Sequence, residues 1–346
     1  MGMKRVFFFP SPTERVRERV LFFPPLMVRI RGGGYKDYSL PHGGGLGWGL
    51  IYHLFESSQN IDLCYHVLMI IDSHTHFGQG SSWGSFTPEA VLNIIGDSVD
   101  YAICSNLEGI DAIDGIKNEL DCNLDMIRAA KKYKKFLPLA VCQADKTLDN
   151  HVMKFLLTEY PEFIGLKFHP ECEKLPATSP KYNKYLELAR EFKKPCLFHS
   201  GHIKSRFSSP ALIYEKAKEF PDVPIILGHL STGQRDSHEA AIEILIDSIE
   251  TESATLYCDT SWIDFGTGNL EDVILLIEKL KNTSKGDYTN RILWATDAPV
   301  GEFNHSNELY RKNLDNFKVK ISSHFEDEQL VQNLLYFNVR DLYGLY

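Results

Sequence analysis

From residue 69 onward, short apolar runs alternate with segments in which apolar residues recur at helical spacing. Each short run is bounded by polar or turn-forming residues, which is typical of a strand. Eight such runs are found, at residues 69–76, 100–106, 135–142, 163–169, 195–200, 224–229, 254–261 and 291–297. The segments between them predict helices, and the apolar stripes are clearest at 239–250 and 269–282.

Start signals support these helices. Thr87-Pro88, Ser179-Pro180 and Ser209-Pro210 each place a capping oxygen before a proline, which suits the first position of a helix. Strand and helix alternating through residues 69–346 predict a (β/α)8 TIM barrel, a fold of about 250 residues. A doubly wound open sheet is the alternative. It requires a glycine-rich phosphate turn after the first strand, and residues 74–80 read HTHFGQG, without the G-x-G-x-x-G pattern.

Residues 1–68 are a different kind of sequence, with prolines that interrupt every short apolar run and no sustained period. They contain no uninterrupted apolar stretch of about 7–15 residues near the start, as a signal peptide would. We predict a poorly structured N-terminal extension, either disordered or produced by a misassigned start, because Met69 stands where the first strand begins. Residues 69–346 would then form the barrel domain.

Composition narrows the function. The 346 residues are 43% hydrophobic and carry a net charge of −9, which does not favour nucleic acid as a partner. No apolar run approaches the roughly 20 residues of a membrane span. The seven cysteines form no C-x-x-C pair, and several lie in strand-like runs, as buried free thiols do. We therefore expect a cytoplasmic protein with a small-molecule partner, and the sequence is compatible with a homo-oligomer.

Polar side chains follow the first predicted strand, in MIIDSHTHFGQG at residues 69–80. Residues two apart in a strand share a face, so Asp72, His74 and His76 are expected to point the same way, with two imidazoles able to hold one ion. Four other predicted strands also end in polar residues, namely Lys167 with His169, then His199, His229 and Asp297. In a barrel these ends meet at the face where catalytic residues lie.

A divalent cation would account for this convergence, because buried charges without a partner cost several kcal/mol. The donors are nitrogen and oxygen with no thiolate, which suits Zn²⁺ first and leaves Mn²⁺, Fe²⁺ or Co²⁺ as alternatives. A metal with an open position brings the pKa of bound water near 7. Asp297, as both ligand and base, can take the proton from that water.

The ordered set of His74-x-His76, His199, His229 and Asp297 on strands one, five, six and eight resembles the amidohydrolase superfamily. Within it, the sequence is most similar to the amidohydrolase-2 group of metal-dependent hydrolases, lactonases and nonoxidative decarboxylases, also in its tail at 333–346. The resemblance covers residues 69–346. It implies that the metal ligands are His74, His76, His199 and Asp297, with His229 as an acid/base or substrate-orienting residue.

Lys167 admits two interpretations. In some amidohydrolases a lysine on strand four is carboxylated and bridges two metals, and the position of Lys167 permits this. The amidohydrolase-2 group usually works with one metal, so one ion is favoured over two. Lys167 is then a cation that binds a substrate carboxylate or polarises a carbonyl, and His169 belongs to the second coordination sphere or to the substrate pocket. Asp72 is expected to orient a histidine or the strand end, Asp259 to support a ligand, and Trp262 to wall the pocket.

The favoured function is a metal-dependent hydrolase of a small carboxylated amide, lactone or ester, in which Asp297 activates the metal-bound water. The alternative is a nonoxidative decarboxylase of an aromatic or unsaturated acid on the same scaffold. A TatD-like nuclease is less favoured, because GLKFHP has lysine where that family carries glutamate and because the chain is acidic. A noncatalytic binding protein would not need a metal beside a base. The remaining histidines are interpreted as ordinary surface or core residues, namely His42, His53, His66, His151, His238, His305 and His324.

Overall fold

The computed structural model describes residues 69–80, 83–110, 117–146, 149–232, 235–262, 270–300 and 306–345, and the backbone of one hairpin. This hairpin pairs β1 (Leu26–Ile30) antiparallel with β2 (Gly34–Tyr38). The chain divides into two compact units, residues 1–68 and 69–346. The prediction that residues 1–68 are a disordered or misassigned extension falls mostly on residues outside the described ones, and it stays a prediction.

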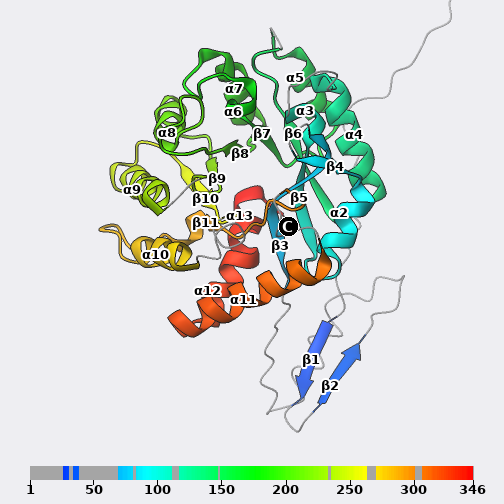
Figure 1. Ribbon diagram of the computed structural model, residues 1–346, viewed down its shortest axis with the longest axis vertical. Coiled ribbons are helices and arrows are strands. Elements are labelled where there is room, and N and C mark those ends of the chain that lie inside the picture. The colour runs from blue at the N-terminus through cyan, green and yellow to red at the C-terminus, as the bar shows by residue number, and fades with distance from the viewer. Residues whose placement is uncertain are drawn as a thin grey trace, which may run out of the picture. The chain divides into compact units, whose positions relative to one another are not determined.

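One curled sheet organises the second unit, with the strand order β11-β10-β9-β8-β7-β6-β5-β3-β4 (Figure 1). Neighbouring strands are parallel except for the antiparallel pair β3–β4. The strands are β3 (Ile71–Gly80), β4 (Gly84–Phe86), β5 (Tyr101–Asn106), β6 (Phe136–Val141), β7 (Gly165–Phe168), β8 (Cys196–His199), β9 (Ile225–Gly228), β10 (Leu256–Asp259) and β11 (Ile292–Leu293).

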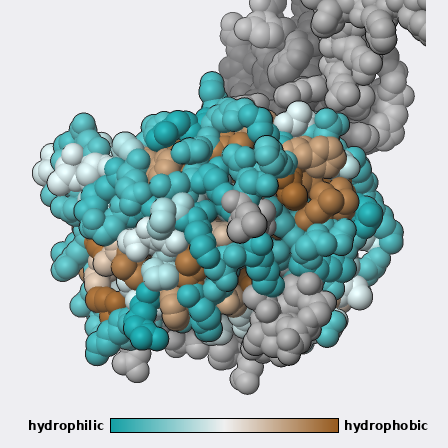
Figure 2. Space-filling view, turned by 90° about the horizontal axis from the view of Figure 1, so that it is seen from above, coloured by the Kyte–Doolittle hydropathy of each residue, from teal (hydrophilic) through white to brown (hydrophobic). Residues whose placement is uncertain are grey.

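Helices connect these strands and surround the sheet in Figure 1, while the last helix lies near its middle. They are α2 (Pro88–Ile95), α3 (Leu107–Ile110), α4 (Glu119–Lys132), α5 (His151–Glu159), α6 (Pro170–Glu173), α7 (Asn183–Phe192), α8 (Pro210–Glu219), α9 (Arg235–Thr251), α10 (Leu270–Lys281), α11 (Asn307–Phe325), α12 (Glu328–Gln332) and α13 (Asn338–Tyr343). On the face drawn in Figure 2, hydrophilic residues predominate and hydrophobic ones form small separate groups. This agrees with helices whose apolar stripes face the sheet.

All eight predicted strands are present in parallel order, so the predicted alternation of strand and helix is confirmed. The ladder is not continuous from β11 back to β3, and a closed barrel is therefore not shown. A single bridge links Thr75 with Ala298 across this gap. The N–H of Asp297 also donates to the carbonyl of His74 at 2.8 Å. The β11 ladder ends early because the next N–H, that of Trp294, donates to the carbonyl of Leu334 instead, at 3.1 Å.

Two boundaries differ from the sequence-based expectation. β3 continues to Gly80 because its end pairs with β4, in a stretch that the sequence predicts to be a loop. Ser179-Pro180 opens a 3-10 turn, η1 (Pro180–Tyr182), and the α-helix α7 begins only at Asn183. At Thr87 the prediction holds, because its hydroxyl oxygen accepts a hydrogen bond from the N–H of Ala90 at 3.2 Å.

The interior of the sheet is filled by one buried apolar residue from each of several strands, packed against α13. This cluster comprises Ile71, Ile103, Leu139, Leu197, Ile226, Leu293, Val339 and Tyr343. Asn338 fixes the start of α13, because its amide donates to the carbonyls of Thr289 and Ile292 at 2.9 and 2.8 Å. The C-terminal helix therefore closes one end of the core and leaves the other end for polar residues.

Six cysteines lie in the described part of the chain, and five of them are buried. Cys64 falls outside it. No helix of the described residues is long and apolar enough to cross a membrane. The cytoplasmic location expected from the sequence stays a prediction.

A chain that begins at Met69 should fold and bind metal like the full-length protein, because the second unit has its own apolar core. We expect the two chains to have the same thermal unfolding midpoint by circular dichroism and the same zinc content after dialysis. Loss of folding or of metal on removal of residues 1–68 would show that this segment belongs to the domain.

Candidate metal site

The middle of β3 brings His74 and His76 to one side of the strand. Their Nε2 atoms lie 3.2 Å apart. Asp72 does not join them, although the period of two predicts it. Its carboxylate accepts hydrogen bonds from the hydroxyls of Thr296 and Tyr310 at 2.5 and 2.8 Å. The register of the β3–β5 pair shifts between Asp72 and Thr75, which interrupts the alternation of faces. Asp72 thus anchors the start of β3, and among the described residues its carboxylate has no hydrogen bond to a histidine ring.

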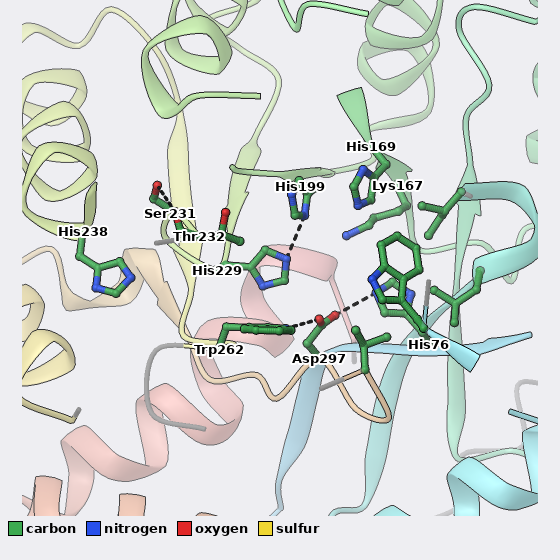
Figure 3. Close-up of a pocket in the computed structure, with 14 residues that line it drawn as sticks. His76, Lys167, His169, His199, His229, Ser231, Thr232, His238, Trp262 and Asp297 are labelled. Carbon is green, nitrogen blue, oxygen red and sulfur yellow. Dashed lines mark hydrogen bonds and ion pairs between the residues drawn. The ribbon is translucent and has the colours of Figure 1, made fainter. Parts of the chain in front are cut away.

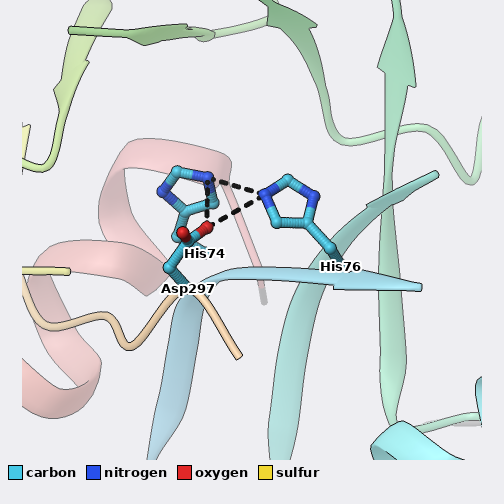
Figure 4. A group of neighbouring side chains, drawn as sticks. All are labelled: His74, His76 and Asp297. Carbon is cyan, nitrogen blue, oxygen red and sulfur yellow. Dashed lines mark hydrogen bonds and ion pairs between the residues drawn. The ribbon is translucent and has the colours of Figure 1, made fainter. Parts of the chain in front are cut away.

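Asp297 completes a cluster with these two histidines (Figure 4). Its Oδ1 lies 3.4 Å from Nε2 of His74 and 3.0 Å from Nε2 of His76. This oxygen is buried and accepts no hydrogen bond from the described residues. Ligands at the corners of a tetrahedron, with bonds of about 2.0–2.1 Å, lie about 3.3 Å from one another. The three donor atoms therefore have the spacing that zinc ligands require.

Asp259, at the end of β10, fixes the orientation of His74. Its Oδ2 lies 2.9 Å from Nδ1 of His74, so this nitrogen carries the proton and Nε2 keeps a lone pair for a metal. The other oxygen accepts a hydrogen bond from the N–H of His229 at 2.8 Å. His74, His229 and Asp259 also form a second group with metal-ligand spacing. Because His74 and Asp259 are already hydrogen-bonded to each other, we interpret this second group as one that orients the His74 ring.

Trp262 holds the second oxygen of Asp297. Its indole N–H donates to Oδ2 at 2.5 Å, and the side chain is 39% exposed (Figure 3). Trp262, Asp297 and His229 all have positive φ, at 68°, 64° and 66°. Non-glycine residues adopt this conformation rarely, and such strained positions gather at functional sites. The backbone thus accepts strain where these three side chains meet.

Lys167 lies on β7 with its ammonium group inside the cluster. The side chain is 1% exposed, and Nζ lies 2.7 Å from Nε2 of His74. One lone pair on that nitrogen cannot serve both Lys167 and a metal. A metal bound there would leave the Lys167 ammonium without this acceptor and available to another group.

His169, His199 and His229 lie beside the cluster and not within it. The rings of His169 and His199 stack with centroids 4.0 Å apart. His199 Nδ1 lies 3.2 Å from Nε2 of His229, whose Nδ1 is 2.8 Å from the hydroxyl of Ser261. Of the four ligands expected from the resemblance, the structure groups His74, His76 and Asp297 and leaves His199 outside that group.

Burial and mutual charge set the protonation of the site. Burial lowers the pKa of His229 to about 3 and also lowers the pKa of His74 and of His76. It lowers the pKa of Lys167 to about 8, against the opposing effect of the Asp297 and Asp259 carboxylates. Burial alone would raise the pKa of Asp297, but the neighbouring histidines hold it below its usual value. Neutral imidazoles beside an ionised carboxylate are the forms that bind a metal.

A cavity of about 450 Å³ opens over these residues (Figure 3). Its lining is His76, Trp83, Leu107, Ile110, Lys167, His169, His199, His229, Ser231, Thr232, His238, Trp262, Asp297 and Val300. The sequence interpretation missed His238, which it treated as an ordinary residue. The histidine stands inside a helical stripe and its partner Asp272 is on the next helix, so no local pattern marks it.

Comparison with known proteins places the fold. Residues 71–345 match the profile of one family, described as amidohydrolase. No curated protein matches the sequence significantly. A probable 2-pyrone-4,6-dicarboxylic acid hydrolase from Acinetobacter baumannii, with citric acid bound, is similar in structure, with 13% identity, a TM-score of 0.56 and coverage of 80% of this chain and 99% of that one.

Two further solved structures are similar to the same extent. The 5-carboxyvanillate decarboxylase from Sphingomonas paucimobilis has 12% identity and a TM-score of 0.56, and the alignment covers 81% of this chain and 100% of the other. An amidohydrolase from Burkholderia multivorans with bound zinc has 10% identity and a TM-score of 0.57, with 80% and 100% coverage. At such low identities, the likeness concerns the fold alone.

Asp259→Asn should weaken zinc binding by roughly 10- to 100-fold, the usual cost of losing a carboxylate that orients a ligating histidine. The asparagine amide can donate to Nδ1 of His74, which would move the proton to Nε2 and remove the lone pair there. The measurement is a competitive zinc titration with a chromophoric chelator. Asp222→Asn is the control, because Asp222 pairs with Arg190 at the surface and is not among the residues of the site. Equal zinc affinity in the two variants would contradict the role of Asp259.

Proposed function

Because this chain belongs to the amidohydrolase family, we propose that it is a metal-dependent hydrolase of a small carboxylated amide, lactone or ester. The observation that carries the proposal is the convergence of His74, His76 and Asp297 beside the buried Lys167, at the base of one cavity. The curled sheet would act as a (β/α)8 barrel, with its strand ends presenting these residues at one face.

The proposed ligands are the grouped His74, His76 and Asp297, with His199 as the fourth. The spacing of the grouped donors suits zinc, and the similar protein from Burkholderia multivorans has zinc bound. One ion is proposed rather than two, since the second donor group is occupied by hydrogen bonds. A carboxylated Lys167 bridging two ions remains the alternative. When bound, the metal would supply a Lewis acid that polarises the reacting carbonyl and lowers the pKa of water.

Lys167 is proposed to bind the carboxylate of the substrate. It is the cation among the cavity-lining residues, and a carboxylate would compensate for its burial. His169, on the neighbouring wall, is proposed to contact the same substrate. An ion pair at the base of the cavity would orient the substrate so that its scissile bond faces Asp297.

Asp297 is proposed to accept the proton of the attacking water and His229 to orient the substrate or return a proton to the leaving group. The oxygen of the water forms a bond to the carbonyl carbon, the bond from that carbon to the leaving atom breaks, and the proton taken from the water goes to the leaving atom. The low pKa of Asp297 keeps its carboxylate ionised. Its Oδ2 accepts a hydrogen bond from Trp262, which stabilises the ionised carboxylate and makes it a weaker base.

This last contact favours the second candidate, a nonoxidative decarboxylase of an aromatic or unsaturated acid. Decarboxylation breaks the bond to CO₂ and protonates the carbon that is left, without activating a water molecule. Asp297 could then keep both its metal-facing oxygen and its bond to Trp262 throughout. The similar protein from Sphingomonas paucimobilis is a decarboxylase on this fold.

Product analysis in ¹⁸O-labelled water distinguishes the two reactions. A panel of lactones, amides, esters and aromatic acids would be screened with the zinc-loaded protein. We expect one ¹⁸O atom in the new carboxylate of the product, detected by mass spectrometry, and no release of CO₂. Release of CO₂ without ¹⁸O in the second product would establish the decarboxylase.

Asp297→Asn should lower kcat by at least roughly 10²–10⁴-fold, because the amide is a poor base and a weaker ligand. The fold should be retained, since asparagine has the same shape. His229→Asn should lower kcat strongly and leave zinc content near that of the native protein. Steady-state kinetics and metal analysis of both variants test these roles. Near-normal turnover of Asp297→Asn with full metal would require another base, and loss of half the metal in His229→Asn would favour two ions.

A further inference from the structure

A buried histidine–aspartate pair reaches the same cavity from outside the metal site. His238 lies in the first turn of α9 and is 4% exposed, and Asp272 lies in the first turn of α10 and is 1% exposed. Nδ1 of His238 is 2.8 Å from Oδ2 of Asp272. The imidazole also lines the cavity. The pair thus joins two helices and at the same time presents a ring to the ligand space.

Asp272 determines which ring nitrogen is left for a ligand. A carboxylate can only accept hydrogen bonds, so Nδ1 of His238 carries the proton in this pair. The Arg235 guanidinium, 3.9 Å from the other carboxylate oxygen, adds a positive charge that supports Asp272 as an acceptor. Among the described residues, the ring makes no further hydrogen bond. Nε2 therefore remains with a lone pair at the cavity.

Two hydroxyl residues stand next to His238 on this wall. The hydroxyl of Ser231 donates to the carbonyl of Gly201 at 2.7 Å, which leaves only its oxygen lone pairs for a ligand. Thr232 lines the cavity beside it. Figure 3 shows His238 set apart from Lys167 and Asp297 in this view, beyond Ser231 and Thr232. We call Ser231 and His238 the acceptor end of the cavity.

The two ends of the cavity have complementary chemistry. Lys167 provides a cation near the proposed metal ligands, whereas Nε2 of His238 and the oxygen of Ser231 provide lone pairs at the other end. These lone pairs bind a hydrogen-bond donor of the substrate. A second carboxylate of the substrate at this position would find no donor. A buried acceptor left without a donor costs free energy. The acceptor end therefore favours a substrate group that donates a hydrogen bond and disfavours one that cannot.

We propose that the acceptor end binds a hydroxyl group of the substrate, so that the preferred substrates are hydroxy acids. The prediction that the substrate is an acid rests on the proposed function, through Lys167 and the metal. The prediction that it carries a hydroxyl group rests on His238, Asp272 and Ser231. His238 is a binding residue here, and Asp272 is a positioning residue that sets its tautomer.

The test compares acids that differ only in one hydroxyl group. Benzoate would be paired with 3- and 4-hydroxybenzoate, and 3-phenylpropanoate with 3-(4-hydroxyphenyl)propanoate, so that the reach of the hydroxyl varies. Binding to the zinc-loaded full-length protein is measured by isothermal titration calorimetry. We expect at least one hydroxy acid to bind roughly three- to tenfold more tightly than its parent, as one added hydrogen bond allows.

Variants of His238 and Asp272 test whether these two residues cause the tighter binding of the hydroxy acid. His238→Phe should abolish it and leave the parent acid unchanged, because the phenyl ring fills the space without a lone pair. Asp272→Asn should also abolish it, since the amide can donate to Nδ1 and shift the proton to Nε2. The same variant should bind terephthalate more tightly than the native protein does, because Nε2 becomes a donor. His324→Gln is the control, as His324 pairs with Glu278 on the surface and does not line the cavity.

The outcomes separate the two proposals. If no hydroxy acid binds more tightly than its parent, the acceptor end is overturned, whether or not the parents bind. A gain that persists in His238→Phe, or an Asp272→Asn protein that keeps the native preference, would also overturn it and leave the pair a structural link between α9 and α10. If the parents bind only with zinc present, the proposed function stands independently. Circular dichroism confirms folding of each variant.

Discussion

The structure depends on placing several ionisable side chains in one buried site at the base of a cavity. Donor atoms of His74, His76 and Asp297 lie within 3.0–3.4 Å of one another, and the Lys167 ammonium is buried among them. Lone pairs at this spacing repel unless a cation or a proton lies between them. Burial lowers the pKa of both imidazoles, and a metal ion could satisfy the three donor atoms together.

The surrounding framework holds this unfavourable arrangement in place. Asp72 links the start of β3 to Thr296 and Tyr310, and Asp259 links His74 to the end of β10. Positive φ values at His229, Trp262 and Asp297 show that the backbone also contributes strain. Burial of apolar residues from the strands and from α13 stabilises the fold and offsets this unfavourable strain and burial of charge. The apolar cluster that stabilises the fold and the polar residues of the candidate site therefore lie at opposite ends of the sheet.

Membership of the amidohydrolase family establishes the fold, whereas the reaction depends on the residues that line the cavity. Solved structures that share the fold at 10–13% identity include a probable hydrolase and a decarboxylase. The reactions differ in whether water is activated, so they differ in what is asked of Asp297. In this chain the indole of Trp262 competes for one oxygen of that carboxylate. The acceptor end adds a second point of selection at the opposite side of the cavity, through groups that touch no proposed metal ligand.

The sequence by itself determined the parallel strand–helix alternation and the face on which the polar residues gather. Short apolar runs and helical stripes carry that information locally, and parallel strands necessarily bring their carboxyl ends to one edge. It also singled out His74, His76, Lys167 and Asp297, which lie together in the structure. It could not determine the side of β3 to which Asp72 turns, because the register shift arises from pairing with β5.

Only the tertiary structure decided the contacts between groups that the chain keeps far apart. The bonds of Asp259 to His74, Trp262 to Asp297 and Asp272 to His238 join residues 185, 35 and 34 positions apart. No period in the sequence encodes them, since each depends on two elements meeting at one angle and on one backbone conformation. These contacts set tautomers and orient lone pairs, which are the properties that decide what the cavity binds.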